Sequence, residues 1–120
     1  LEGANKQFGS YTMISSATHG LIKDLYPCRE LARLTVVGRK EPVCVYEPFL
    51  KEDYLEKQEV LDRFSQGLSA FYQGNFSKAA GFFETIAGQD GPASHYLTKC
   101  RRLIDSPPAS WDGVWSLSSK

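Results

Sequence analysis

Net charge is the first thing that this sequence lacks. Its 14 lysines and arginines are balanced by 14 aspartates and glutamates. Proteins that bind nucleic acid concentrate positive charge, because phosphates dominate the attraction. The chain as a whole has no excess of positive charge, and we therefore expect no nucleic-acid partner.

Long apolar runs are also missing. A helix that spans a bilayer needs about 20 predominantly apolar residues, whereas the apolar runs in this sequence are only a few residues long. We expect no membrane contact by this segment.

Cysteine is scarce, and its spacing fits no known framework. Cys28, Cys44 and Cys100 are odd in number and contain no C-x-x-C pattern. This pattern favours buried thiols in a reducing compartment over a disulfide scaffold or a zinc site. The sequence therefore predicts a cytoplasmic location and no metal site.

Other chemically capable side chains have ordinary explanations. His19 and His95 are far apart and form no His-x3-His pattern, so neither is expected to act as a metal ligand or a base. Ser15 and Ser16 fit helix capping and lack the glycines of a nucleophile elbow. No catalytic residue is assigned within the chain.

The first part of the chain has an α/β pattern. Tyr11–Ile14 is a short β-prone run. The hydroxyl residues that follow it favour the start of a helix that continues to about Leu25. The apolar face of this helix is expected to contain Leu21, Ile22 and Leu25.

A β-hairpin should follow this helix. Residues alternate from Cys28 to Val37, which places Leu31 and Arg33 on one face and Ala32 and Leu34 on the other. A Gly- and Pro-containing turn leads to the partner strand at 43–46. Because an isolated hairpin is marginally stable in water, this part needs upstream strands or the helices that follow.

The remainder of the chain is predicted to be helical. Apolar residues recur at helical spacing over Lys51–Gln73, and Gly74 and Asn75 end this helix. Two further helices follow, and the last ends where Pro107 and Pro108 remove amide donors. The apolar face of the third helix should contain Ala93, Tyr96, Leu97, Cys100, Leu103 and Ile104.

The helical part resembles a tetratricopeptide unit. That motif places a small residue on its first helix twelve positions before an Ala-x3-Phe pair on its second, and Gly67, Ala79 and Phe83 have this spacing. Close helix crossing requires small side chains, which predicts helix-packing roles for these three residues. The match is partial, with Arg63, Gln66 and Ala70 where the motif prefers Trp, Leu and Tyr. An unrelated helical hairpin is the alternative.

A lone repeat cannot bury its apolar face. The third helix must therefore act as a cap, or the unit must pack on the first part of the chain. The tail after the proline pair contains Trp111 and Trp115. These rings either dock within the chain or form a candidate interface for a protein partner, since exposed tryptophan is enriched at interfaces.

Three segments carry a further resemblance, in the order Leu1–Gly9, Ile14–Thr18 and Arg29–Glu47. Together they resemble the C-terminal third of a bacterial class III adenylate/guanylate cyclase catalytic domain, with that family's order and spacing. The likeness covers residues 1–49. The helical tail, with Asp90–Pro92 and Trp111–Val114, resembles extensions of some membrane-anchored bacterial members.

This resemblance implies a parent protein that converts ATP or GTP to a 3′,5′-cyclic nucleotide and pyrophosphate. Catalysis in the family takes place at the interface of a homodimer, with two Mg²⁺ or Mn²⁺ ions. Its metal-binding aspartates, base-selecting residues and Asn/Arg pair correspond to positions upstream of Leu1. Since the chain opens without Met, we expect it to be a piece of a longer protein, and the resemblance implies that this piece holds scaffold without the catalytic residues.

One weak phosphate-binding candidate remains at the hairpin turn. Many family members carry a lysine immediately before the turn glycine, but Val37 stands there in this sequence. Arg39 or Lys40 would have to reach a nucleotide phosphate from the other side of Gly38. The simpler interpretation is that both are solvated turn charges.

Together these patterns predict an α+β chain in three parts. Residues 1–49 form an incomplete cyclase-type α/β half, 50–106 form tetratricopeptide-like helices with a third capping helix, and 107–120 form a tryptophan-containing tail. Two functions compete: the end of a nucleotidyl cyclase, whose fragment is structural or regulatory, and a protein-binding helical module. The preferred hypothesis is the first.

Overall fold

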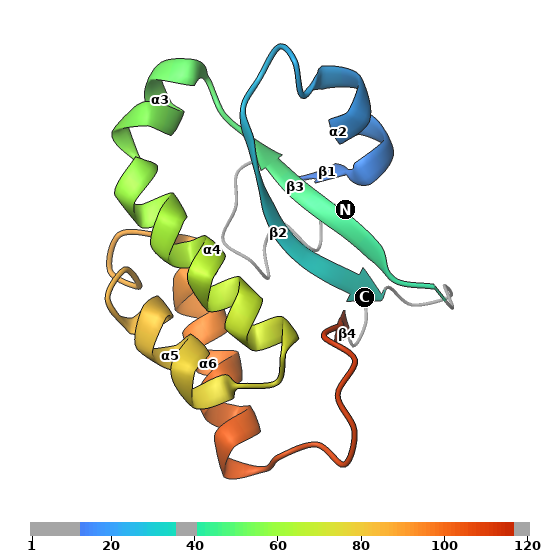
Figure 1. Ribbon diagram of the computed structural model, residues 1–120, viewed down its shortest axis with the longest axis vertical. Coiled ribbons are helices and arrows are strands. Elements are labelled where there is room, and N and C mark those ends of the chain that lie inside the picture. Colours follow the sequence, from blue (N-terminus) through green and yellow to red (C-terminus); the bar gives the residue numbers. More distant parts are fainter. Residues whose placement is uncertain (1–12, 36–40, 117–120) are drawn as a thin grey trace. The chain divides into compact units, whose positions relative to one another are not determined.

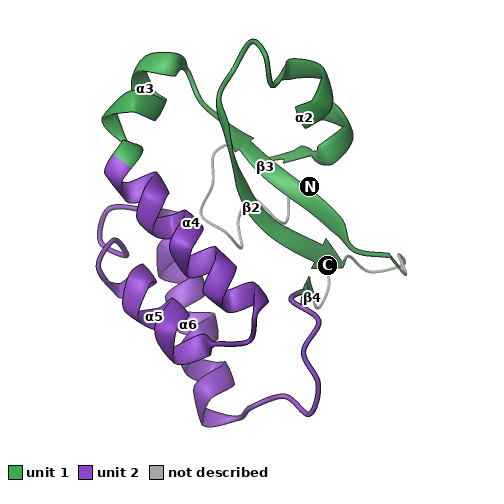
Figure 2. Cartoon of the chain, in the orientation of Figure 1, with its two compact units in different colours: residues 1–58, 114–120 green, residues 59–113 purple. Residues whose placement is uncertain are grey.

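The computed structural model describes residues 13–35 and 41–116, and its fold is α+β. The chain forms two compact units (Figure 2). Unit 1 comprises residues 1–58 and 114–120, and unit 2 comprises residues 59–113. The sequence-based division at residues 49/50 and 106/107 differs from this one, because helix α3 belongs to unit 1 and the chain returns to unit 1 at Val114.

Unit 1 is built on a four-stranded sheet with the strand order β1-β3-β2-β4 (Figure 1). β2 (Cys28–Thr35) and β3 (Val43–Pro48) form the expected antiparallel hairpin. β1 (Ile14–Ser15) pairs antiparallel with β3. β4 (Trp115–Ser116), which the sequence did not predict, pairs parallel with the end of β2.

Helix α2 (Ser16–Ile22) is shorter than expected, and its predicted apolar face is wrong at Leu21 and Leu25, whereas Ile22 is half-buried. Ser15 caps it by accepting a hydrogen bond from the Thr18 amide at 3.3 Å. Leu21 and Leu25 are 82% and 75% exposed. The reason lies on the opposite side of the helix, where the His19 ring stacks on Tyr46 of β3 at 3.9 Å. This contact turns Leu21 away from the sheet.

The strict alternation predicted for the first hairpin strand is also wrong. The register shifts between Glu30 and Ala32, which pair with the consecutive residues Tyr46 and Val45. Leu31 is therefore the extra residue of a β-bulge, which changes the side of the sheet that later residues face. Leu31 and Ala32 are both fully buried as a result, and Arg33 is exposed.

The helix predicted over Lys51–Gln73 is divided in two. α3 (Lys51–Glu56) ends at Lys57, whose φ of −95° and ψ of 10° leave the helical region. α4 (Gln58–Tyr72) then begins at once. Neither Gly nor Pro stands near this break, so no local signal marks it.

Unit 2 packs α4 with α5 (Phe76–Glu84) and α6 (Gly91–Asp105). Asn75 and Asp90 cap α5 and α6 through hydrogen bonds from the amides of Lys78 and Ala93. Gly74, with φ of 85°, makes the turn between α4 and α5, where a side chain would be strained.

Aromatic rings form the core of unit 2. The Tyr96 ring lies 4.8 Å from Phe71, 5.0 Å from Phe83 and 5.7 Å from Phe64, so α6 closes over both other helices. The expected α6 face is buried up to Cys100, but Ile104 is 42% exposed, which corrects the end of that prediction. Within the described ranges, no helix is both long and apolar enough to cross a membrane.

Candidate functional site

A buried ion pair connects the two strands of the hairpin. Arg29 and Glu47 are register partners on β2 and β3, and the Arg29 Nε and Nη2 atoms lie 2.8 and 2.7 Å from the same Glu47 carboxylate oxygen. Both side chains are nearly buried. The guanidinium also lies 5.7 Å from the centre of the Phe49 ring, within the range of a cation–π contact. This pair was not assigned from the sequence, although both residues end the segment that resembles cyclases.

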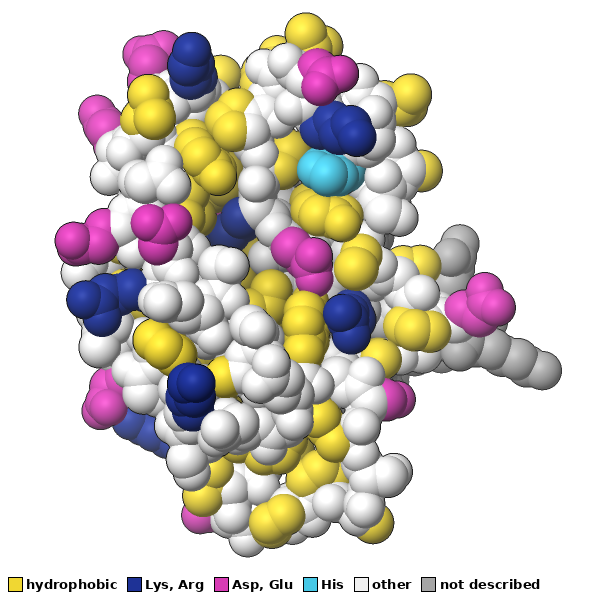
Figure 3. Space-filling view, viewed as in Figure 1, with side chains coloured by type: hydrophobic (Ala, Val, Ile, Leu, Met, Phe, Trp, Pro, Cys, Tyr) yellow, Lys and Arg dark blue, Asp and Glu magenta, His cyan; other side chains and the backbone are white. Residues whose placement is uncertain are grey.

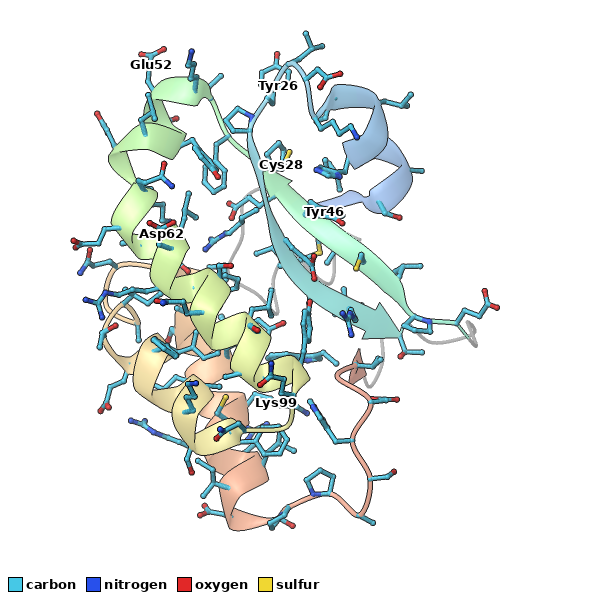
Figure 4. All side chains as sticks on the ribbon, viewed as in Figure 1. Tyr26, Cys28, Tyr46, Glu52, Asp62 and Lys99 are labelled. Carbon is cyan, nitrogen blue, oxygen red and sulfur yellow. The ribbon has the colours of Figure 1, made fainter. Side chains whose placement is uncertain are left out.

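Two cysteines and a tyrosine, Cys28, Cys44 and Tyr46, lie on the same hairpin. The Cys28 thiol donates a hydrogen bond to the Tyr26 carbonyl at 3.4 Å (Figure 4). Burial raises the pKa of the Cys28 thiol, and burial together with the Glu30 charge raises the pKa of Cys44. Burial is also the main cause of the raised pKa of Tyr46. Raised thiol pKa values oppose thiolate formation.

Two of the three predicted helix-packing residues, Gly67 and Phe83, meet where α4 crosses α5. A methyl group added at Gly67 would lie 2.8 Å from a ring carbon of Phe83. Ala79 and Phe83 are fully buried. The absence of a side chain at Gly67 therefore makes room for the Phe83 ring.

Both tail tryptophans are engaged within the chain. The Trp111 ring packs edge-on against Phe71 and Phe76, at 5.0 and 4.9 Å, in unit 2. In unit 1, Trp115 is 8% exposed and pairs with Leu34 in the sheet. Of the two alternatives for the tail, the structure therefore has the docked one.

A groove of 220 Å³ lies between α4 and α5, and sequence reasoning missed it. Its lining combines an apolar floor with amide, hydroxyl and ammonium groups. The lining residues are Gln66, Ser69, Ala70, Gln73, Lys78 and Phe82. The signal in the sequence is the helical spacing of Gln66, Ser69 and Ala70 on α4.

The remaining candidates do not assemble into a site. Arg39 and Lys40 lie outside the described residues. His95 is exposed on α6, and Ser15 is occupied as the α2 cap. Within residues 13–35 and 41–116, no group of three His, Cys, Asp or Glu side chains is placed to hold a metal ion. Figure 3 shows charges of both signs interspersed over the visible face, as the balanced composition predicts.

Comparison with known protein families, with curated proteins and with solved structures finds no match to this chain.

Proposed function

We propose that this chain is the C-terminal segment of a class III nucleotidyl cyclase. In this proposal, unit 1 contributes its hairpin to the catalytic sheet, and unit 2 is a structural or coupling appendage. The parent protein converts ATP or GTP to a 3′,5′-cyclic nucleotide and pyrophosphate in intracellular signalling. It acts as a cytoplasmic catalytic homodimer that is anchored to the membrane through upstream segments.

The hairpin carries this proposal. Arg29–Glu47 is the longest run that resembles the family, and it supplies both strands of one antiparallel pair. Its two end residues, Arg29 and Glu47, meet as a buried ion pair. The β2–β3 hairpin therefore brings the two charged ends of the run together. This supports the interpretation that the whole run corresponds to one hairpin of the cyclase fold.

The chemistry itself belongs to residues upstream of Leu1. Displacement at phosphorus is served by two metal ions that stabilise the attacking and leaving oxygens, together with cations that neutralise the developing charge. In the proposal, upstream aspartates hold Mg²⁺ or Mn²⁺, and an upstream Asn/Arg pair stabilises the transition state. The 120-residue chain then supplies scaffold alone.

The test is cyclic-nucleotide synthesis by the longer protein that contains this segment. We expect an Asn-x3-Arg sequence directly before Leu1, paired aspartates farther upstream, and product from ATP or GTP with Mg²⁺ or Mn²⁺. The purified 120-residue chain should form no product above a heat-killed control. The proposal would be contradicted by a longer protein without the paired aspartates, or by cyclic-nucleotide synthesis in the isolated chain.

A second candidate function is protein binding by unit 2. The observation that favours it is the groove between α4 and α5, whose lining contains Gln66, Gln73 and Lys78. Such a role is compatible with a tetratricopeptide-like appendage on a cyclase, and it can be tested without nucleotide.

A further inference from the structure

We infer that the break between α3 and α4 at Lys57 is a helical switch, which exchanges with a single helix over residues 51–72. The ring contact between Phe49 and Tyr54 holds the broken form. This device is built into the chain itself and goes beyond the cyclase proposal, on which it does not depend.

The break is confined to one residue. The Lys57 amide donates a hydrogen bond of 3.1 Å to the carbonyl oxygen of Asp53, as in an uninterrupted helix, and α4 begins at Gln58. Lys57 has φ of −95° and ψ of 10°, whereas the helical values are about −63° and −42°. No forbidden region separates these two conformations, so a rotation at this single residue closes the break.

The local sequence favours the uninterrupted helix. The residues on both sides of the break are strong helix formers, namely Leu55, Glu56, Lys57, Gln58 and Glu59. α3 has only six residues, and isolated helices shorter than about 12–15 residues are marginal in water. As an extension of α4, the same residues avoid the cost of starting a helix of their own.

The apolar stripe of α4 also continues through the break. Leu61 and Phe64 are 5% and 1% exposed in unit 2. The same alternation of three- and four-residue steps, continued toward the N-terminus, arrives at Lys57 and Tyr54, both of which are half-buried. Residues at this spacing lie on one face of a single helix, and the stem of a lysine can cover apolar surface. The pattern therefore keeps one phase where the structure has two helices.

A contact within unit 1 opposes the uninterrupted helix. The Tyr54 ring lies 5.9 Å from the Phe49 ring at an angle of 61°, an edge-on pair. The Phe49 ring is itself in contact with the Arg29 guanidinium, at 5.7 Å. Because α3 contains no buried residue and Leu55 is 59% exposed, little other packing holds α3 in place. The Phe49–Tyr54 pair thus joins α3 to the end of the hairpin.

The position of the switch gives it a regulatory role. The boundary between the two units follows Gln58, directly after the break (Figure 2). The conformation of Lys57 therefore determines whether the first turn of α4 begins a helix or continues one. A ligand or partner that binds unit 1 and separates Phe49 from Tyr54 would favour the single helix, and one that prefers the single helix would weaken that contact in turn.

Nuclear magnetic resonance on the full 120-residue chain tests this inference. Relaxation dispersion detects exchange on the microsecond to millisecond timescale, and we expect it at residues 56–60 of the wild type. The three-bond HN–Hα coupling of Lys57 reports its φ directly. Phe49→Ala removes one ring from outside the helix, so helix propensity is unchanged, and the ratio of single to broken helix should rise about two- to tenfold. The Lys57 coupling should fall toward the helical value.

Two further variants separate the ring contact from helix propensity. Tyr54→Ala removes the other ring and should shift the ratio in the same direction, and since it lies on a helix without buried residues, it keeps the test available if Phe49→Ala does not fold. Leu55→Ala is the matched control on α3. Its side chain is exposed, and leucine and alanine have similar helix propensities, so it should leave the ratio within about twofold of the wild type. Circular dichroism establishes that each variant is folded.

The inference is overturned if the folded ring variants keep the wild-type coupling of Lys57 and show no exchange at residues 56–60. It is equally overturned if Leu55→Ala shifts the ratio as much as Phe49→Ala does. No nucleotide enters these measurements, so either result leaves the cyclase proposal to its own test.

Discussion

The indole Nε1–H of Trp111 donates a hydrogen bond of 2.8 Å to the carbonyl oxygen of Phe71, a residue 40 positions earlier in the chain. Phe71 lies in the last turn of α4, and its carbonyl oxygen also accepts a hydrogen bond of 3.0 Å from the Gly74 amide. The same ring covers Gly74, where an added methyl group would lie 3.1 Å from an indole carbon. Trp111 therefore attaches the tail to the α4–α5 turn.

Replacement of Trp111 by Phe should destabilise unit 2. The substitution removes the indole donor and part of the ring that packs on Phe71 and Phe76, and we expect a loss of about 1–3 kcal/mol. Urea unfolding followed by circular dichroism measures this change. A variant that unfolds at the wild-type urea concentration would show that the tail contact contributes nothing.

Tryptophan fluorescence tests the burial of each ring separately. In the Trp111→Phe variant, the remaining Trp115 should emit at a blue-shifted wavelength and resist iodide, because it is 8% exposed. In the Trp115→Phe variant, Trp111 should also be protected relative to free tryptophan. Water-like emission and full quenching in both variants would contradict the docked tail.

The crossing of α4 and α5 can be tested with two glycines. In Gly67→Ala, the new methyl group meets the Phe83 ring at 2.8 Å. Tyr96 stacks on that ring and leaves it little room to move. Overpacking should outweigh the gain in helix propensity, for a net loss of about 1–3 kcal/mol.

Gly81→Ala is the matched control on α5. Apart from the neighbouring residues and the backbone of α5 itself, no heavy atom of the described residues lies within 4 Å of its added methyl group, so the variant should gain about 0.5–1 kcal/mol from helix propensity. Thermal melting compares the two variants directly. Equal shifts of the same sign would mean that Gly67 does not lie at a close crossing.

The ion pair of Arg29 and Glu47 should be costly to break from one side. Glu47→Gln removes the carboxylate charge that lies 2.7 Å from the nearly buried guanidinium, and we expect a loss of about 3–5 kcal/mol. The double variant Arg29→Met with Glu47→Leu should recover much of that stability, because it removes both buried charges. Glu52→Gln, on exposed helix α3, serves as the control. A double variant no more stable than Glu47→Gln would argue against this account.

Cys100 should resist alkylation in the folded chain. Burial raises its pKa from 9.0 to about 12. Between pH 9.0 and about 12, the thiol therefore stays protonated in the folded protein but loses its proton in the unfolded protein. Iodoacetamide at pH 8, followed by peptide mass spectrometry, should label Cys28 and Cys44 before Cys100. Comparable labelling of all three in the native chain would refute the burial of this thiol.

The same shift predicts the direction of a pH effect on stability. Because the folded pKa of Cys100 is the higher one, its contribution is fully present below pH 9.0 and is lost as the pH rises toward about 12. Cys100→Val lacks the thiol and should lose less stability over this interval than the wild type. Urea unfolding at pH 8 and at alkaline pH measures the difference.

Local signals in the sequence were sufficient for most element ends. Ser15, Asn75 and Asp90 cap the helices that they precede, and the turn at Gly74 separates α4 from α5. Capping depends on a side chain and an amide three positions later, so neighbours in the chain determine it. The resemblance to cyclases was also visible in the residues, and it stays a prediction.

Contacts between distant residues decided the rest. The amphipathic pattern of α2 pointed Leu21 toward the core, but the stacking of His19 on Tyr46 rotates the helix the other way. The bulge at Leu31 reverses an alternation that the sequence presents without interruption, because the register depends on which residues of β3 lie opposite. The α4–α5 groove exists only once two helices are packed, since its floor and its cation come from different helices. The sequence pattern thus determined the α+β class and the capped starts of α2, α5 and α6. The break between α3 and α4, the orientation of α2, the bulge and the groove follow from packing energies that no local window of sequence contains.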